Sequence, residues 1–367
     1  MSAAPSTPTE ASALAGPGAP FDVAPWRGGP DPLPLVVQAR SAREVDGLVA
    51  WIRANHAALR GELARVGAIL FRGFAVDDAP AFERVARAVD DGLGNEYLGT
   101  SPRNGLTDYV FTASELPPFY PIPQHCEMSF TANPPRRLFF CCLLEPDAGG
   151  GETPLVDFRE VYKQLDPAVL ARFEQGGIRI VRNYAGPESA SKLDLWKLKR
   201  WDEMFATTDR AAVEAKCREE GFEPTWSPNG SLRLTSTQPV LRRHPDSGEA
   251  VWHNHSQVFH LSAAPGEYRR IYELRPTLRH WVLWRFARLM VGVQRRTRAA
   301  DEQSMHCTYL DGSEIPDVDM EAVRDAIWRN LVVIPWKRGD VVAIDNYAVA
   351  HGRLPYRGPR QVAVCWA

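Results

Sequence analysis

The order of apolar and polar positions predicts helices that flank a set of short strands. Apolar side chains recur at near-helical spacing from Ala42 to Val66, and residues 67–73 follow as a short apolar strand between two glycines. Ala79 to Leu93 and Phe158 to Gln175 show the same helical pattern, each with charged residues opposite its apolar stripe. We therefore expect these helical segments to cover a sheet.

The sheet is predicted from short apolar segments that end at Gly, Pro or Asp. Seven segments fit this description: 138–144, 178–183, 232–237, 250–252, 331–334, 340–345 and 361–366. Their spacing is typical of an antiparallel sandwich or jelly roll. The predicted fold class is α+β with a mainly β core: a double-stranded β-helix (jelly roll) with flanking helices and a helical insertion.

A chain of 367 residues without an internal repeat fits one elaborated domain. The first 20 residues are rich in Ala, Pro, Ser, Thr and Gly and have no secretory pattern. We expect residues 1–30 to form a flexible N-terminal tail. Residues 31–367 are predicted to form a single jelly-roll domain, with the helical insertion at about 265–300.

The insertion from Pro265 to Ala300 is the most basic part of the chain. It carries nine arginines and two acidic residues, Glu267 and Glu273. The arginines are Arg269, Arg270, Arg275, Arg279, Arg285, Arg288, Arg295, Arg296 and Arg298. We expect them mainly to form a solvated face with salt bridges to acidic neighbours. The alternative is that the insertion lies beside the pocket mouth and steers a carboxylate substrate or an acidic carrier protein.

Overall composition excludes several classes of protein. Apolar residues make up 44% of the chain and charged residues 24%, which are ordinary globular values. A net charge of −2 gives no field that would attract nucleic acid. The most apolar helical stretch, Trp281 to Val293, is interrupted by Arg285 and Arg288, so we expect no membrane span. Six cysteines without a C-x-x-C pair indicate reduced thiols and a cytoplasmic location.

Candidate metal chemistry begins at the sequence His125-Cys-Glu127. On an extended segment alternate side chains share a face, so His125 and Glu127 would point into one pocket. An imidazole and a carboxylate supply two of the three ligands of a facial triad, which leaves iron positions open for a co-substrate and oxygen. A third ligand is offered by His351, which follows an apolar strand and a turn.

Arginines near the C-terminus would complete such a site. Arg353, Arg357 and Arg360 all follow His351. The planar guanidinium bonds both oxygens of a carboxylate and keeps its charge, which suits the distal carboxylate of a dicarboxylate co-substrate. His351 and Arg360 would thus place a metal and a carboxylate anchor in one pocket.

Several motifs in the same order resemble the taurine dioxygenase-like (TauD/TfdA) superfamily. The resemblance is closest to the clavaminate synthase-like and aminoacyl (nonribosomal peptide) hydroxylase branches, and it runs roughly from Leu59 to the C-terminus. The motifs that carry it lie at 71–74, 122–127, 149–154, 248–254, 345–353 and 358–360.

The resemblance implies a ligand set and a reaction class. It implies that His125, Glu127 and His351 bind Fe(II), and that 2-oxoglutarate and O2 are co-substrates. Thr153 and Arg360 would bind the far carboxylate of 2-oxoglutarate. A dioxygenase of this kind converts 2-oxoglutarate to succinate and CO2 while it oxidises a C–H bond.

Two departures from the wider family narrow the expected reaction. The acidic ligand is Glu127 instead of the commoner Asp, as in branches that hydroxylate amino acids, and it fills the space that halogenating relatives leave for chloride. The apolar residues Val362 to Val364 stand where a sulfonate-handling relative has a second arginine, which disfavours a taurine-like substrate. We expect hydroxylation of an amino acid or of an aminoacyl group tethered to a carrier protein. The alternatives are desaturation or cyclisation with the same cofactors, and a non-catalytic jelly-roll metal-binding protein.

Other polar residues are weaker candidates. Arg103 lies in a stretch that resembles the aminoacyl-hydroxylase branch, where an arginine near the mouth would bind a substrate carboxylate. His253 and His255 form a second same-face pair and are candidate substrate contacts. The remaining single histidines are predicted to be structural: His244, His260, His280 and His306.

Overall fold

The computed structural model describes residues 12–15, 20–27, 32–99, 101–146, 149–187 and 199–367. Its largest sheet has seven strands in the order β1-β2-β3-β14-β6-β16-β4. These strands are β1 (Phe21–Pro25), β2 (Leu35–Ala39), β3 (Ala68–Arg72), β14 (Val341–Asp345), β6 (Arg137–Leu144), β16 (Gln361–Trp366) and β4 (Phe111–Thr112). Neighbouring strands pair antiparallel, except that β2 and β3 run parallel.

Three smaller sheets complete the β structure of the described residues. A three-stranded sheet has the order β5-β15-β7 and consists of β5 (Ile122–His125), β15 (Val349–Arg353) and β7 (Leu155–Asp157). A four-stranded sheet consists of β13 (Met305–Thr308), β8 (Ile178–Tyr184), β10 (Leu232–Gln238) and β9 (Glu223–Trp226). The shortest pair is β11 (Arg242–Arg243) with β12 (Ala250–Val251).

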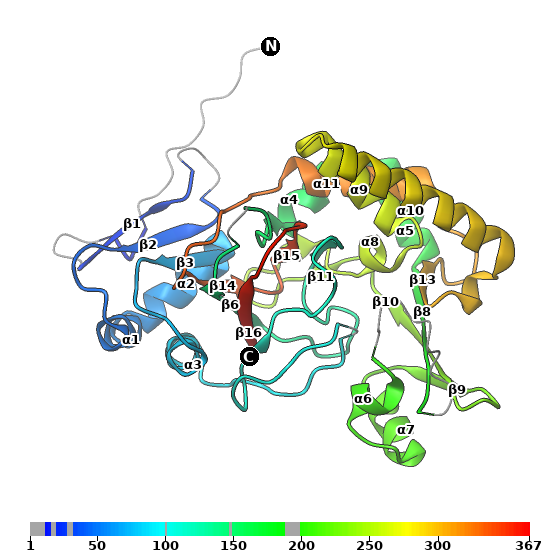
Figure 1. The fold of residues 1–367 in the computed structure, drawn as a ribbon, viewed down its shortest axis with the longest axis horizontal. Coiled ribbons are helices and arrows are strands. Elements are labelled where there is room, and N and C mark those ends of the chain that lie inside the picture. Colours follow the sequence, from blue (N-terminus) through cyan, green and yellow to red (C-terminus); the bar gives the residue numbers. More distant parts are fainter. Residues whose placement is uncertain (1–11, 16–19, 28–31, 100, 147–148, 188–198) are drawn as a thin grey trace, which may run out of the picture.

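Helices surround these sheets (Figure 1). Those of the first half are α1 (Val45–Ala54), α2 (His56–Val66), α3 (Ala79–Val89), α4 (Phe158–Gln164) and α5 (Pro167–Gly176). Those of the second half are α6 (Trp201–Phe205), α7 (Arg210–Glu219), α8 (Ser256–Phe259), α9 (Ala263–Leu274), α10 (Leu278–Thr297), α11 (Asp317–Arg329) and the 3-10 turn Ala300–Glu302. No helix of the described residues is long and apolar enough to cross a membrane.

Strand alternation divides the buried side chains into two cores. Ile69 and Phe71 of β3 pack in one cluster with apolar residues of α1, α2 and α3. Leu70 lies on the other face of β3, in a second cluster that also holds Phe140 of β6 and Val349 of β15. Because successive side chains of a strand point to opposite faces, one strand serves both cores. The second cluster is the one that surrounds the candidate site described below.

The predicted helices exist, but two of them are broken. The predicted helix Ala42–Val66 forms α1 and α2, which meet at Asn55, whose amide Nδ2 donates to the Trp51 carbonyl over 2.9 Å. The predicted helix Phe158–Gln175 forms α4 and α5. Asp166 begins the second of these because its Oδ1 accepts from the Ala168 N–H, and proline occupies the first helical turn, where no donor is needed.

One predicted strand is wrong. The segment 331–334 forms only an isolated bridge, in which Val332 and Leu155 exchange two main-chain hydrogen bonds of 2.9 Å. Pro335 follows directly and has no N–H to continue a ladder. High β-propensity therefore gave a false prediction here, because no neighbouring strand extends the pairing.

The predicted tail is shorter than expected. Phe21–Pro25 pairs with β2 along its whole length, and Leu14 is only 4% exposed. The Ala13 N–H donates to Glu62 Oε1 over 2.8 Å, which ties the segment 12–15 to α2. The prediction of a flexible tail is therefore wrong for 12–15 and 21–25, while residues 1–11, 16–19 and 28–30 lie outside the described residues.

Candidate active site

The pairing of β5 with β15 brings two histidines together. His125 and His351 are direct register partners across this antiparallel pair, and their ring centroids are 4.4 Å apart. Residues directly opposite in such a pair have neighbouring side chains, so the register alone creates a two-histidine site. On its other edge β15 pairs with β7, where His351 lies opposite Leu155.

Glu127 reaches the same site from a turn and not from a strand. β5 ends at His125, so the extended alternation predicted from the sequence does not reach Glu127. Asn346 instead holds its main chain: Oδ1 accepts from the Glu127 N–H over 2.6 Å, and Nδ2 donates to the Glu127 carbonyl over 2.9 Å. His125 and Glu127 do come together, with candidate ligand atoms within 4.8 Å, but the reason lies in this two-point contact and not in strand alternation.

The three side chains fit a metal ion. One ligand atom from each of His125, Glu127 and His351 lies within 4.8 Å of the others. The Nδ1 of His125 donates to the Pro123 carbonyl over 2.8 Å, which leaves Nε2 with its lone pair free. Burial lowers the pKa of His125 and holds that of His351 well below its usual range. Two neutral imidazoles and one carboxylate are the donor set of a facial triad.

Arg103 is the unexpected neighbour of this centre. Its Nη2 donates to Glu127 Oε2 over 2.6 Å, and its side chain is 6% exposed. The guanidinium carbon stands 4.0 Å from the centroid of the Tyr97 ring. Its Nε and Nη1 are buried and have no hydrogen-bond partner among the described residues. A buried cation with unused donors beside a candidate metal ligand is suited to bind an anion.

Thr153 and Arg360 lie in the same pocket as the two histidines. The pocket is lined among others by His125, His351, Thr153, Arg360 and Arg103. Trp336 Nε1 donates to Thr153 Oγ1 over 3.3 Å, so the hydroxyl proton stays available for another acceptor. Burial and the neighbouring Arg353 lower the pKa of Arg360 to about 10, which still leaves it charged at neutral pH.

A glycine fixes the position of Arg360. The Nε of Arg360 donates to the Gly151 carbonyl over 2.8 Å. Gly151 has a φ of +65°, and a Cβ there would stand 2.8 Å from the Cδ of Arg360. A side chain at this position would therefore collide with the arginine, and the positive φ already disfavours one.

The other C-terminal arginines have different roles. Arg353 lines the pocket, but its guanidinium donates to the main-chain carbonyls of Leu116, Pro117 and Tyr120, which fixes that loop. Arg357 is exposed. Of the three arginines singled out from the sequence, Arg360 is thus the one that lines the pocket and donates to a single carbonyl, that of Gly151. Its guanidinium has no acidic partner in the part of the chain that the structure describes.

His253 and His255 are absent from the residues that line the pocket. The His255 ring is 5.2 Å from that of His125, and its Nδ1 is 2.5 Å from Ser129 Oγ. His253 stacks on Tyr347 and its Nε2 donates to the Asn346 carbonyl over 3.2 Å. His253 therefore contacts Asn346, which positions Glu127, and His255 contacts the His125 ring itself.

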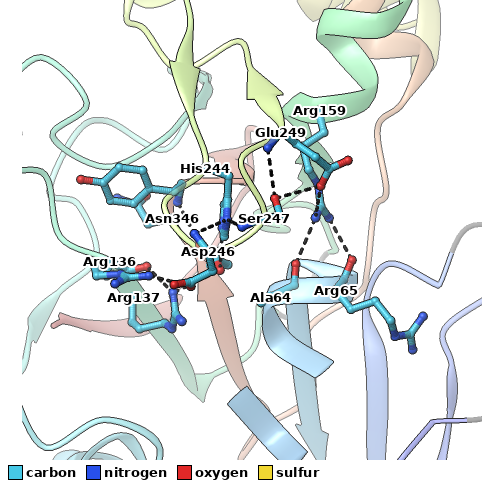
Figure 2. Close-up of polar contacts among 12 residues, drawn as sticks. Ala64, Arg65, Arg136, Arg137, Arg159, His244, Asp246, Ser247, Glu249 and Asn346 are labelled. Carbon is cyan, nitrogen blue, oxygen red and sulfur yellow. Dashed lines mark hydrogen bonds and ion pairs between the residues drawn. The ribbon is translucent and has the colours of Figure 1, made fainter. Parts of the chain in front are cut away.

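His244 supports the turn that carries Asn346. Its Nδ1 accepts from the N–H groups of Asp246 and Ser247 (Figure 2). Its Nε2 donates to Asp345 Oδ2 over 3.1 Å. Arg137 Nη1 lies 3.1 Å from the same carboxylate oxygen. Because its Nε2 must carry the proton, this histidine has no lone pair left for a metal, and its predicted structural role is confirmed.

A second histidine cluster also has a structural explanation. Nitrogens of His260 and His306 and a Glu314 oxygen come within 4.8 Å of one another. However, His306 Nδ1 accepts from the Leu261 N–H, so its protonated Nε2 donates to Glu314 over 2.9 Å. His260 Nδ1 likewise accepts from the Ser262 N–H. Both Nε2 atoms therefore carry protons, and the cluster is not a metal site in this arrangement.

The basic insertion reaches the pocket region through α9 and its C-terminal end. The Tyr268 hydroxyl donates to the Phe119 carbonyl over 3.0 Å. Arg275 pairs with Glu152 over 2.6 Å, next to Thr153. The expected salt bridges to acidic neighbours also form, since Arg270 pairs with Glu321 and Asp325. No residue of α10 lines the pocket.

Comparisons with known proteins agree with these features. The chain is 28% identical over 344 residues to the dapdiamide synthesis protein DdaC of Enterobacter agglomerans, across 94% of this chain and 93% of that protein. It is 30% identical over 302 residues to a clavaminate synthase-like protein of Arabidopsis thaliana, across 81% of this chain and 80% of that protein.

Solved structures of low sequence identity share the fold. PvcB of Pseudomonas aeruginosa has a TM-score of 0.50 at 13% identity, with 98% of this chain and 94% of that chain covered. Residues 31–366 match the model of a family described as taurine catabolism dioxygenase TauD, TfdA family. This match spans nearly the whole chain and confirms the resemblance seen in the sequence. The chain therefore belongs to the TauD/TfdA family of dioxygenases.

Proposed function

We propose that this chain hydroxylates an unactivated C–H bond of an amino acid or aminoacyl substrate, with Fe(II), 2-oxoglutarate and O2 as cofactor and co-substrates. The observation that carries the proposal is the placement of two kinds of group in one pocket. One candidate ligand atom from each of His125, Glu127 and His351 lies within 4.8 Å of the others, and Thr153 and Arg360 line the same pocket as the two histidines. A structural metal site has no need of a carboxylate anchor, which disfavours the non-catalytic alternative.

Some residues of the chain would hold the cofactors, and Asn346 would keep one of these residues in place. His125 Nε2, the Glu127 carboxylate and His351 would hold iron, and Asn346 keeps Glu127 in place. The Arg360 guanidinium and the Thr153 hydroxyl would bind the distal carboxylate of 2-oxoglutarate. When bound, iron and 2-oxoglutarate supply the oxidising chemistry, in which O2 is consumed and succinate and CO2 are formed.

Arg103 supports a substrate that carries a carboxylate. Its Nε and Nη1 are buried and have no hydrogen-bond partner within the described part of the chain, although the residue lines the pocket. Leaving charged donors unsatisfied is costly, so an anionic group of the substrate would stabilise this arrangement. This observation favours a free amino acid over an aminoacyl thioester, in which the carboxylate is no longer charged.

The carrier-tethered substrate stays the second candidate. Similarity to a dapdiamide synthesis protein supports a role in specialised metabolism, where either form of substrate occurs. Turnover of a free amino acid and of the same residue loaded on a carrier protein separates the two forms. Arg103→Met should raise the KM for the free amino acid strongly and change the KM for the tethered form little, because only the first presents a carboxylate.

The direct test of the proposed function is an anaerobic titration with Fe(II) and 2-oxoglutarate. A weak visible charge-transfer band is expected when both are present, and its absence would favour the non-catalytic binding protein. Amino acid panels are then incubated in air, and succinate and products are measured by mass spectrometry. A product that gains one oxygen supports hydroxylation, whereas a product that loses two hydrogens supports desaturation or cyclisation.

We also infer the type of fold, the bounds of the domain and the cellular location. The seven-stranded sheet and the β5-β15-β7 sheet, joined where β14 passes into β15, support a double-stranded β-helix. Residues 31–367 are proposed to form one domain, to which the segments 12–15 and 21–25 also contribute contacts. Six buried free cysteines are compatible with a reducing cytoplasm, which stays a proposal.

A further inference from the structure

Helix α10 exposes an apolar face that no described part of the chain covers. Ala287 is the single buried residue of this 20-residue helix. Seven of the eleven exposed large apolar residues in the described chain lie on it: Leu278, Trp281, Val282, Phe286, Leu289, Met290 and Val293. Positions 278, 282, 286, 289 and 293 follow helical spacing and therefore form one stripe.

The opposite side of α10 is attached to the rest of the molecule. α10 packs along α9, with Trp284 stacked on Tyr272 at 6.0 Å between ring centroids. Near its C-terminal end, Arg295 pairs with Asp317 of α11 over 2.6 Å. Figure 1 shows α10 along the outer edge of the molecule, beside α9. The apolar stripe is thus held outward by a fixed helix and is not the surface of a loose segment.

The composition of α10 is that of a protein interface. It contains five arginines, two tryptophans, one phenylalanine and one methionine, and no Lys, Asp or Glu. Aromatic residues, Met and Arg are enriched in interface cores, and Lys, Asp and Glu are depleted there. Arg285 and Arg288 each stand 5.9 Å from the Trp284 ring centroid, so their charges lie along their own helix.

We propose that α10 packs against α10 of a second copy of this chain, antiparallel and around a two-fold axis, to form a homodimer. This inference goes beyond the proposed reaction and does not depend on it. A second copy has no other apolar patch to offer among its described residues, because the remaining exposed large apolar residues are only Leu144, Leu274, Leu310 and Val318. The stripe of one copy must then pack against the same stripe of the other copy. A contact between two identical surfaces gives a closed dimer.

Charge at the two ends of α10 fits the antiparallel arrangement. The N-terminal end carries Arg279, which has no ion pair with any described residue. The C-terminal end carries Arg295 and Arg296, of which Arg295 already pairs with Asp317, so the acidic side chain left to face Arg279 is that of Glu314, which is 56% exposed. Antiparallel packing places the N-terminal end of α10 in one copy against the C-terminal end of α10 in the other. It also sets the two helix dipoles in opposite directions, which is favourable.

The length of the helix is sufficient for a stable contact. Twenty residues of α-helix span about 30 Å. Contact along such a helix, widened by the neighbouring α9 and α11, can reach the roughly 800 Å² per partner that standard interfaces bury.

Sedimentation velocity of the full-length protein over a concentration series tests the dimer. The wild type is expected to sediment as a dimer, and a double variant with Phe286→Arg and Leu289→Arg as a monomer with unchanged circular dichroism. Leu144→Arg, on the distant strand β6, is the matched control and should stay dimeric. A monomeric wild type at every concentration, or a double variant that stays dimeric, would overturn the proposal.

Two further measurements distinguish other occupants and fix the axis. A monomeric wild type that sediments with vesicles of phosphatidylcholine and phosphatidylglycerol would assign the face to anionic lipid instead.

For the geometry of the dimer, Phe286→Cys should form an intermolecular disulfide under mild oxidation, because position 286 lies near the centre of the stripe. Leu278→Cys should not, since an antiparallel pair separates its two copies by about 24 Å. All native cysteines are buried and do not compete. Cross-linking at both positions would indicate parallel packing and contradict the two-fold axis proposed.

Discussion

The proposed metal-binding end of the pocket (the metal end) and the proposed carboxylate-binding end (the carboxylate end) are built from different kinds of backbone. At the metal end, His125 and His351 are opposite residues of two paired strands. At the carboxylate end, Thr153 stands in the loop before β7, and Arg360 stands directly before β16. The first pair of residues is positioned by sheet register, and the second by a few side-chain and loop contacts.

This difference sets the expected response to mutation. A strand register cannot shift by one residue without moving every side chain to the other face, so the two histidines of the metal end are fixed by the whole sheet. The position of Arg360 depends on its bond to the Gly151 carbonyl and on the absence of a side chain at Gly151. Changes at the metal end should therefore abolish activity, whereas changes at the carboxylate end should alter the requirement for 2-oxoglutarate.

The largest effect is expected from removing a metal-binding side chain. His125→Ala, Glu127→Ala and His351→Ala should each abolish succinate formation without unfolding the protein, because an open site that lacks one ligand loses affinity and geometry together. Fe(II) binding and circular dichroism are measured for each variant. His280→Ala, outside the pocket lining, is the control and should keep activity. Full activity in any one of the three variants would remove that residue from the metal site.

Arg360→Ala should have the next largest effect. Loss of a charge-assisted pair of hydrogen bonds costs roughly 3 kcal/mol, which corresponds to about a 100-fold rise in the KM for 2-oxoglutarate. Arg357→Ala is the matched control, because this arginine is exposed and follows the same strand. If Arg357→Ala raised the KM and Arg360→Ala did not, the anchor would be misassigned.

The sequence predicted elements with a regular apolar pattern better than features that depend on one side chain or on a distant strand. Periodicity located α3, β6, β8, β10, β14 and β16 within a few residues, because their apolar positions are buried in the way that a helix or strand requires. Breaks at Asn55 and Asp166 were missed, since capping by a single side chain leaves the periodicity almost unchanged. The strand predicted at 331–334 failed because pairing depends on a distant partner, which propensity does not reveal.

At the site, residue types were easier to predict than the contacts that position them. His125, Glu127, His351, Thr153 and Arg360 were all identified from motifs, and the structure brings them into one region. The bond between Arg103 and Glu127, the contact of Trp336 with Thr153 and the role of Asn346 depend on long-range packing. A signal for Asn346 existed, because it lies within the motif that contains His351, but its partner was 219 residues away.

Asn346→Ala should produce a moderate effect at the metal end. It leaves the buried Glu127 N–H and carbonyl without their partners, so the ligand turn loses its fixed position. Groups that orient metal ligands typically change metal affinity by about 10- to 100-fold. Activity is measured against Fe(II) concentration, and excess iron should restore most of the turnover. A lower thermal midpoint with an unchanged Fe(II) dependence would instead indicate a purely structural role.

The smallest effect is expected at Thr153, and it tests how far the carboxylate end depends on a single hydroxyl. Thr153→Val keeps the shape but removes the donor, and it also takes the acceptor from Trp336 Nε1. One neutral hydrogen bond contributes about 0.5–1.5 kcal/mol, so the KM for 2-oxoglutarate should rise by roughly two- to tenfold with little change in kcat. Thr153→Ser retains the hydroxyl and should bind 2-oxoglutarate nearly as well as the wild type. Equal KM values for the Val variant and the wild type would leave Arg360 as the sole anchor, and an equal loss in both variants would indicate that the methyl group matters as much as the hydroxyl.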